Sequence, residues 1–355
     1  MKKVAIIGSV GVPASYGGFE TLADNIIDDS ASKGVEYTVF CSHRHYHEKL
    51  STYKGATLKY INLNANGVQS ILYDGLSLMK SLREYDAVVV LGVSGGVFFP
   101  FFKLLSHTKL IVNIDGLEWK RSKWKGFAKL FLRLSEEFAL RFSDVVIADN
   151  QAIVNYISRR YQKKTVLIPY GGDHVVRELS KRSVGKTLHK YGLIAKQYAI
   201  SICRIEPENN CDMILDSFIG RTLPIVLIGN FANSKYGTTL KERYASYANI
   251  HLVDALYDLD TLYVLRQNSK FYIHGHSAGG TNPALVEAMF CGCNILAYDV
   301  IFNRNTTKNR AAYFSDREGL SALLGSDTDN VSLMLSLASE LYKWGNIACG
   351  YESLY

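Results

Sequence analysis

The sequence lacks the short signatures of several common protein classes. Its six cysteines are scattered and form no paired CxxC pattern, which argues against a structural zinc site and favours free thiols in a reducing cytoplasm. No GxGxxG fingerprint follows the first apolar run, VAIIG at 4–8, so a nicotinamide-dependent oxidoreductase is disfavoured. The one DxD-like stretch, SDTDN at 326–330, lies in a late loop. We therefore expect a protein that needs neither a metal ion nor a cofactor.

Uninterrupted apolar runs of membrane-spanning length are also missing. The longest candidate, AVVVLGVSGGVFFPFFKLL at 87–105, is broken by serine, glycine and proline and is better explained as strand, loop and helix. The opening MKKVAIIG is short and is expected to be a first strand rather than a signal peptide. The histidines of HRHYH, at 43–47, can be interpreted as a metal site, but a surface loop is the preferred interpretation because no carboxylate cluster accompanies them.

What remains is a globular composition with a positive charge. The 355 residues are 48% hydrophobic and 21% charged, and the net charge is +7. This balance suits one very large domain or two ordinary ones. The positive charge suits an anionic ligand or an anionic membrane surface, and no nucleic-acid-binding motif is present.

Short β-branched runs alternate with helical patterns along the whole chain. In the first half the expected strands are VAIIG, YTVF, TLKYI, AVVVLG, KLIVNID, DVVIAD and TVLIPYGG, and in the second half YAISIC, PIVLIGN, NIHLVD, KFYIHGH, NILAYD and AAYF. This alternation predicts an α/β protein with two doubly wound, Rossmann-like domains, 1–172 and 173–355, that face each other across a cleft. A last helix at about 331–344 can pack back on the first domain.

The segment HGHSAGGTNPALVEAM, at 274–289, indicates a phosphate site. A strand ends in a glycine-rich loop, and Pro283 begins a helix whose free N–H groups and positive dipole end favour a diphosphate. The backbone N–H groups of Thr281 and Asn282 are candidate donors. Glu287, one turn into the helix, can accept hydrogen bonds from ribose hydroxyls, or it can simply complement the helix dipole.

Arg204 and a glycine pair are further candidates for donor binding. Arg204 ends the strand YAISIC, where its guanidinium can pair with a diphosphate or form an ordinary surface salt bridge. Gly17 and Gly18 end the loop GVPASYGG after the first strand. They can present N–H groups to a phosphate, or they can form only a tight turn.

Several polar residues follow strands of the first half and are expected to border the cleft. Asp115 and Glu118 follow KLIVN, and Asp115 can bind hydroxyls of an acceptor or donor sugar, or cap a helix. Asp149 can act near the reacting carbon or be the N-cap of the next helix. Tyr170, before Gly171–Gly172, can touch the acceptor or pack the hinge.

A basic, aromatic and amphipathic stretch follows Glu118. We expect it to contact an anionic membrane through a set of aromatic and basic side chains, with Trp119 also on the acceptor side. The set comprises Trp119, Lys120, Arg121, Lys123, Trp124 and Lys125. The alternative is a core helix with a solvated basic face.

These motifs together resemble retaining nucleotide-sugar glycosyltransferases of family four, which have the GT-B fold of two Rossmann domains. Gly17–Gly18, Arg204 and Glu287 match the family's glycine pair, its arginine at the start of the second domain and the second glutamate of its E-x7-E pattern. Two positions depart from the pattern. The sequence ENN at 208–210 stands where the family has a lysine, and Gly279 replaces the first glutamate.

The segments GVPASYGGFETLADNI, DGLEWKRSKW, VIADN, CRIEPENN and GHSAGGTNPALVEAM resemble a narrower branch, bacterial rhamnosyltransferases of cell-surface polysaccharide synthesis. This resemblance implies dTDP-L-rhamnose as donor, a lipid-diphosphate-linked sugar as acceptor, and a cytoplasmic enzyme peripheral to the inner face of the cell membrane. Arg204 would stabilise the leaving diphosphate, with Asp115 or Asp149 as a possible base. The alternatives are another GT-B hexosyltransferase using a UDP- or GDP-sugar, a nucleotide-sugar epimerase, or a basic, non-catalytic binding protein.

Overall fold

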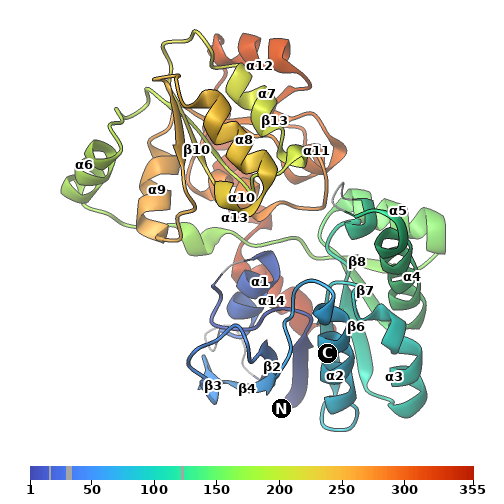
Figure 1. Ribbon diagram of the computed structural model, residues 1–355. Coiled ribbons are helices and arrows are strands. Elements are labelled where there is room, and N and C mark those ends of the chain that lie inside the picture. The colour runs from blue at the N-terminus through green and yellow to red at the C-terminus, as the bar shows by residue number, and fades with distance from the viewer. Residues whose placement is uncertain (16, 29–33, 121–123) are drawn as a thin grey trace. The chain divides into compact units, whose positions relative to one another are not determined.

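The computed structural model describes residues 1–15, 17–28, 34–120 and 124–355, which form two compact units (Figure 1). Unit 1 comprises residues 1–170 and 344–355, and unit 2 comprises residues 171–343. The change of unit after Tyr170 lies two residues before the predicted boundary. The chain then returns to unit 1 for its final twelve residues, which the sequence had assigned to the second domain.

Unit 1 is a strand–helix alternation around one sheet. Its strands are β1 (Lys2–Ile7), β2 (Val35–Ser42), β3 (Thr52–Tyr53), β4 (Ala56–Ile61), β5 (Ala87–Leu91), β6 (Lys109–Asn113), β7 (Val145–Ala148) and β8 (Thr165–Leu167). Its helices are α1 (Gly18–Ile26), α2 (Gln69–Lys80), α3 (Phe99–Leu105), α4 (Gly126–Phe142), α5 (Gln151–Tyr161) and α14 (Trp344–Glu352), with 3-10 turns η1 (Gly96–Phe98) and η2 (Glu118–Lys120).

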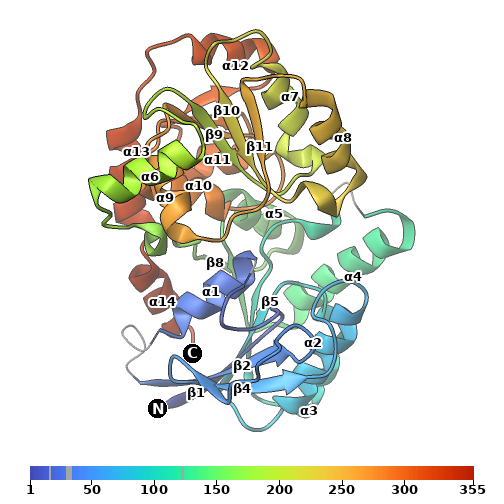
Figure 2. The ribbon, with the colours of Figure 1, turned by 60° about the vertical axis from the view of Figure 1, so that its left-hand side comes forward.

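The sheet of unit 1 has the order β3-β4-β2-β1-β5-β6-β7-β8, and β3 alone among these strands runs antiparallel to its neighbour. All five side chains of β5 are buried because helices cover both faces of the sheet. Leu22 of α1 and Trp344 of α14 share one apolar cluster with Val4 and Val39 on one face. Right-handed crossovers place α2, α3 and α4 on the other face, as Figure 2 shows.

Unit 2 repeats this architecture with six parallel strands. They are β9 (Ala199–Ile202), β10 (Ile225–Ile228), β11 (Ile250–Val253), β12 (Phe271–His274), β13 (Ile295–Tyr298) and β14 (Ala312–Phe314), in the order β11-β10-β9-β12-β13-β14. The helices are α6 (Lys181–Lys190), α7 (Cys211–Asp216), α8 (Lys235–Tyr244), α9 (Leu259–Gln267), α10 (Pro283–Phe290), α11 (Ile301–Thr306), α12 (Arg317–Leu324) and α13 (Val331–Leu341). The 3-10 turns are η3 (Asp173–Val175), η4 (Pro207–Asn209) and η5 (Phe231–Asn233).

The expected last helix, at about 331–344, corresponds to α13, and a further helix follows it. α13 stays in unit 2, where Met334 and Leu337 share an apolar cluster with Leu285 of α10. α14 belongs to unit 1 and packs on α1. α14 was not predicted from the sequence. None of the helices in the described ranges is at once long enough and apolar enough to cross a bilayer.

Candidate active site

In unit 2, the loop between β12 and α10 carries the predicted diphosphate donors. Thr281 is buried, and Asn282 is the N-cap of α10, with its Oδ1 accepting the Ala284 N–H at 3.0 Å. The Asn282 carbonyl accepts the next two N–H groups of the helix, those of Leu285 and Val286. The first turn of α10 is therefore already capped. An anion at this end of the helix would meet the N–H groups of the loop at 279–282 rather than those of the helix interior.

The loop after β9 is tied to the loop after β12. The Glu208 carbonyl accepts both the N–H (2.9 Å) and the hydroxyl (2.8 Å) of Ser277. The Asn209 Oδ1 lies 2.8 Å from His276 Nδ1, and Asn210 Nδ2 donates to the Gly275 carbonyl at 2.8 Å. Because β9 and β12 are parallel neighbours, their carboxyl ends meet at one edge of the sheet. The ENN segment, which departs from the family pattern, thus joins the two loops through its carbonyl and amide groups.

Arg204 stands on the first of these loops with an exposed side chain. Its carbonyl accepts the Asn209 side-chain amide at 2.7 Å, which fixes the backbone. Within the described ranges, its guanidinium makes no hydrogen bond or ion pair with the protein. The surface salt bridge, the alternative interpretation of Arg204, is therefore not formed, and the guanidinium is available to an anion.

Glu287 makes an ion pair that the sequence analysis did not foresee. Its Oε2 lies 2.5 Å from a terminal nitrogen of Arg266, whose side chain is 2% exposed. The Arg266 Nε and Nη1 atoms are buried without a hydrogen-bond partner in the described part of the chain. Glu287 is thus the countercharge of a buried guanidinium. Its carboxylate is still 18% exposed, so one oxygen can also meet a ligand.

His174, on η3, lies beside the second oxygen of Glu287. The His174 Nε2 is 3.8 Å from Glu287 Oε1. Burial lowers the pKa of His174, and the nearby Glu287 carboxylate only partly offsets this effect. The imidazole is therefore neutral near pH 7 and adds a polar group, not a charge, to the Glu287 site.

A sequence signal for the buried arginine did exist. Arg266 follows Leu259 and Leu262 at i+7 and i+4, so it lies on the apolar stripe of α9. A charge in such a position needs a partner when it is buried. His174 gave no comparable signal because its contact joins residues more than one hundred positions apart.

In unit 1, the loop that ends at Gly17 and Gly18 is held by two carboxylates. Gly17 has φ 121°, and a Cβ there would stand 2.0 Å from Glu20 Oε2, so only glycine fits. The Glu20 Oε1 accepts the Val10 N–H at 2.8 Å, and Asp24 Oδ2 accepts the Ala14 N–H at 2.7 Å. Burial raises the pKa of Glu20. Neither Glu20 nor Asp24 was predicted from the sequence to support this loop.

The start of α1 differs from the start of α10. Gly17 is its N-cap and supplies no side-chain hydrogen bond. The Glu20 carboxylate lies at this end of the helix, next to Gly17 and its own backbone N–H. Tyr170 is buried, donates its hydroxyl to the Gly18 carbonyl, and stacks edge-on against Trp344 at 5.0 Å. The hydroxyl of Tyr170 therefore holds the glycine loop in place. Of the two interpretations of Tyr170, its contacts support packing.

Asp115 and Asp149 follow the neighbouring strands β6 and β7. Asp115 has φ 56°, and its N–H donates to Asn113 Oδ1 at 2.9 Å. The Asn113 Nδ2 donates to the Tyr351 hydroxyl of α14 at 2.6 Å. Burial raises the pKa of Tyr351, and the charges of Asp149 and Asp115 raise it further. Both carboxylates therefore lie close to one buried phenol.

The capping interpretation of Asp149 is wrong. Asn150 is the N-cap of α5, and its Oδ1 accepts the Ala152 N–H at 3.0 Å. Asp149 is 5% exposed at the end of β7. Its carboxylate is therefore largely shielded from solvent.

The tryptophans predicted to touch a membrane are bound within the protein. The Trp119 indole N–H donates to buried Glu136 at 3.0 Å, and the Trp124 indole N–H donates to Glu118 at 2.9 Å. Both rings are half-buried, whereas Lys120 and Lys125 are exposed. Trp119 and Trp124 are thus poor anchors, because insertion would break these bonds. Arg121 and Lys123 lie outside the described residues.

The alternating histidines of 43–47 include one with a clear contact. The His45 Nε2 lies 2.7 Å from the Ser15 hydroxyl, which ties this segment to the glycine loop. In the ranges that the structure describes, no group of three His, Cys, Asp or Glu side chains is arranged to hold a metal ion.

Comparison with known proteins identifies the fold. Residues 1–173 match a family described as "Domain of unknown function (DUF1972)". A search of curated proteins gives no match. Sucrose-phosphate synthase from Thermosynechococcus elongatus superposes with a TM-score of 0.83 at 14% identity, covering 100% of this chain and 98% of its own.

Two further solved structures agree. HepE from Anabaena, in complex with UDP-glucose, gives a TM-score of 0.78 at 15% identity, with 100% of this chain and 99% of that chain covered. The catalytic domain of starch synthase IV from Arabidopsis thaliana, bound to ADP and acarbose, gives 0.72 at 14% identity, with 100% and 98% covered. These neighbours are GT-B glycosyltransferases. The chain therefore has the GT-B fold, as predicted.

Proposed function

We propose that the protein is a retaining glycosyltransferase that moves L-rhamnose from dTDP-L-rhamnose to a lipid-diphosphate-linked sugar. The observation that carries the donor part is the exposed guanidinium of Arg204, which has no protein partner in the described chain and stands on the loop tied to residues 275–277. Neighbours of the same fold were solved with UDP-glucose or ADP, which supports a nucleotide sugar as ligand.

Donor binding is assigned to unit 2. The diphosphate would be held by Arg204 and by N–H groups of the loop at 279–282, including those of Thr281 and Asn282. One oxygen of Glu287 would accept a hydrogen bond from the deoxyribose hydroxyl of the donor while the other remains paired with Arg266. The proposed pair between the Arg204 guanidinium and a donor phosphate is charge-assisted. Such a pair is about twice as strong as a neutral hydrogen bond.

The chemistry would be a substitution with retention. The bond between the sugar's anomeric carbon and the phosphate oxygen breaks with both electrons leaving on the diphosphate, and the sugar passes through an oxocarbenium-like state. Arg204 and the loop amides stabilise the developing phosphate charge. The acceptor hydroxyl attacks the same face, and its proton passes to the departing phosphate oxygen. Asp115 or Asp149 in unit 1 is the alternative base.

Unit 1 is assigned to the acceptor. Gly17 and Gly18 are the exception, because their N–H groups, at the start of α1, are proposed to meet a phosphate of the donor. Glu118 and Trp119 are the proposed acceptor-side contacts, near the basic residues of α4. A lipid-linked acceptor would bring the enzyme to the inner face of the cell membrane.

A second candidate donor is a UDP- or ADP-sugar, because the solved neighbours hold UDP-glucose and ADP. The test is turnover with a panel of nucleotide sugars and a short lipid-diphosphate sugar as acceptor. We expect dTDP-L-rhamnose to be consumed only when the acceptor is present, and we expect NMR of the product to show the anomeric configuration of the donor. If only a UDP- or GDP-sugar is turned over, that sugar nucleotide replaces dTDP-L-rhamnose as the proposed donor. If no sugar nucleotide is turned over, the proposed activity is wrong.

A further inference from the structure

Unit 1 exposes apolar side chains in helical stripes. On α4, Phe127, Leu130 and Leu134 are spaced i, i+3 and i+7, so they share one face, and Phe127 is 81% exposed. The opposite side of the same helix is buried through Leu132 and Leu140. The outer stripe is therefore not part of the core.

The neighbouring helices carry matching stripes. On α3, Phe101, Leu104 and Leu105 are exposed, Leu104 by 82%. On α2, the spacing of the exposed side chains Leu72, Leu76 and Met79 also places them on one face. Half of the exposed large apolar side chains in the described chain lie on these three helices. A soluble surface rarely gathers so many in one place without a binding role.

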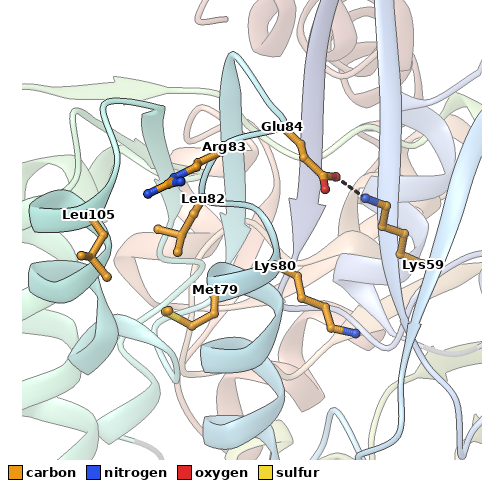
Figure 3. A pocket seen from close by; sticks show the side chains of 7 residues that line it. All are labelled: Lys59, Met79, Lys80, Leu82, Arg83, Glu84 and Leu105. Carbon is orange, nitrogen blue, oxygen red and sulfur yellow. Dashed lines mark hydrogen bonds and ion pairs between the residues drawn. The ribbon is translucent and has the colours of Figure 1, made fainter.

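The three stripes form one face. α3 packs directly on α4, and Gly96 of η1 lies against Ser135 of α4. Gly75 of α2 lies against Phe98, at the end of η1. Met79 of α2 and Leu105 of α3 line the same pocket (Figure 3). We call this surface, made by the outer sides of α2, α3 and α4, the α2–α4 face.

The pocket at the edge of this face is amphipathic. It has a volume of about 600 Å³, with an apolar part from Met79, Leu82 and Leu105. Its charged side chains are Lys59, Lys80, Arg83 and Glu84, and the carboxylate is already paired with Lys59. Two exposed cations, Lys80 and Arg83, thus stand beside apolar side chains, which suits a phosphate attached to a hydrocarbon chain.

The other end of the face is also basic. Lys129 and Arg133 are exposed on α4, in the turns of the helix that also carry the apolar stripe. Asp144, which follows α4, is paired with Lys103 of α3 at 2.9 Å. Apolar side chains bordered by cations favour an anionic lipid surface. Two copies of this face would instead oppose basic rims of the same sign.

We propose that the α2–α4 face docks on the headgroup region of an anionic bilayer, with Phe127 and Leu104 inserted and Lys80 and Arg83 on lipid phosphates. This docking proposal goes beyond the proposed activity. It assigns membrane contact to side chains other than the tryptophans. Trp119 and Trp124 keep their hydrogen bonds inside the protein. The α2–α4 face belongs to the helical layer of unit 1 that does not contain α1 and α14.

The test is flotation of the whole chain with phosphatidylcholine vesicles, with and without phosphatidylglycerol. Wild type should float with the anionic vesicles and only weakly with the neutral ones. The double variant Leu104→Ser/Phe127→Ser should bind about a hundredfold more weakly, because two large side chains no longer leave water. Lys80→Ala/Arg83→Ala should bind about thirtyfold more weakly.

A matched control is Ile194→Ser/Ile301→Ser, which removes two exposed apolar side chains of unit 2. It should float like wild type. Unchanged flotation of the two face variants, or equal flotation of wild type with neutral and anionic vesicles, would overturn the proposal. So would a wild-type dimer in sedimentation velocity that Leu104→Ser/Phe127→Ser dissociates, since the face would then bind a second copy.

Titration with dTDP separates this proposal from the proposed activity. The face variants should bind dTDP like wild type, which also shows that they are folded. Loss of vesicle binding with intact dTDP binding supports the docking face whatever the acceptor is. Failure of wild type to bind dTDP would remove the donor assignment and leave the vesicle result standing.

Discussion

The pair Arg266–Glu287 yields the sharpest prediction, because one residue has two proposed roles. Glu287→Leu leaves the Arg266 guanidinium, 2% exposed, without a countercharge. Removing one partner of a buried pair costs about 3–5 kcal/mol, and for a unit the size of 171–343 this lowers the unfolding midpoint by about 6–20 °C. Arg266→Met/Glu287→Leu replaces the whole pair by apolar side chains and should recover most of that loss.

The assay is scanning calorimetry of wild type and the two variants, followed by dTDP titration of each folded protein. If Glu287 also accepts from a ribose hydroxyl, the double variant should regain stability but not dTDP affinity. Lys241→Met is the control, because its pair with Asp254 is exposed and should contribute less than about 1 kcal/mol. Wild-type stability of Glu287→Leu would refute the buried-pair argument. Wild-type dTDP affinity of the double variant would refute the ribose role.

Three further changes have defined outcomes. Arg204→Ala should leave the calorimetric midpoint within a few degrees, because the side chain has no partner in the described chain, and should weaken dTDP binding by titration about 10- to 100-fold. Tyr351→Phe should cost unit 1 about 1–3 kcal/mol in urea unfolding, because the Asn113 amide loses its buried acceptor. Burial raises the pKa of Asp74 from 3.8 to about 7. The folded state therefore holds the proton more tightly than the unfolded state, and the free energy of unfolding should fall by roughly 4 kcal/mol as pH rises from about 4 to about 7. Asp74→Asn should flatten this dependence. All three tryptophans lie in unit 1, so their fluorescence reports its urea unfolding. A pH-independent midpoint in wild type would contradict the Asp74 prediction, and a full-affinity Arg204→Ala would remove Arg204 from the site.

The strands and their order of appearance were predictable because each signal is local. Runs such as AVVVL are apolar throughout, since helices cover both faces of a parallel sheet, and glycine or proline marks each end. The loop before Pro283 was found for the same reason. Asn282, Pro283 and the preceding glycines are a helix start that a short window reveals.

The contacts that support the site were not predictable from such windows. Glu20 holds the glycine loop through an amide ten residues away, and Tyr351 reaches Asn113 across 238 residues. The hydrogen bond of Trp119 was not predicted, because a helical pattern shows which side chains are amphipathic but not which partner satisfies an indole N–H. Glu136, seventeen residues later, satisfies it.

The central claim is that the loop at 279–282 and Arg204 bind the diphosphate of a sugar nucleotide. The most direct measurement is a crystal structure of the protein with dTDP. The account predicts density for both phosphates against the Arg204 guanidinium and the loop amides, with the deoxyribose hydroxyl at Glu287. Bound dTDP whose phosphates touch neither Arg204 nor this loop would contradict it.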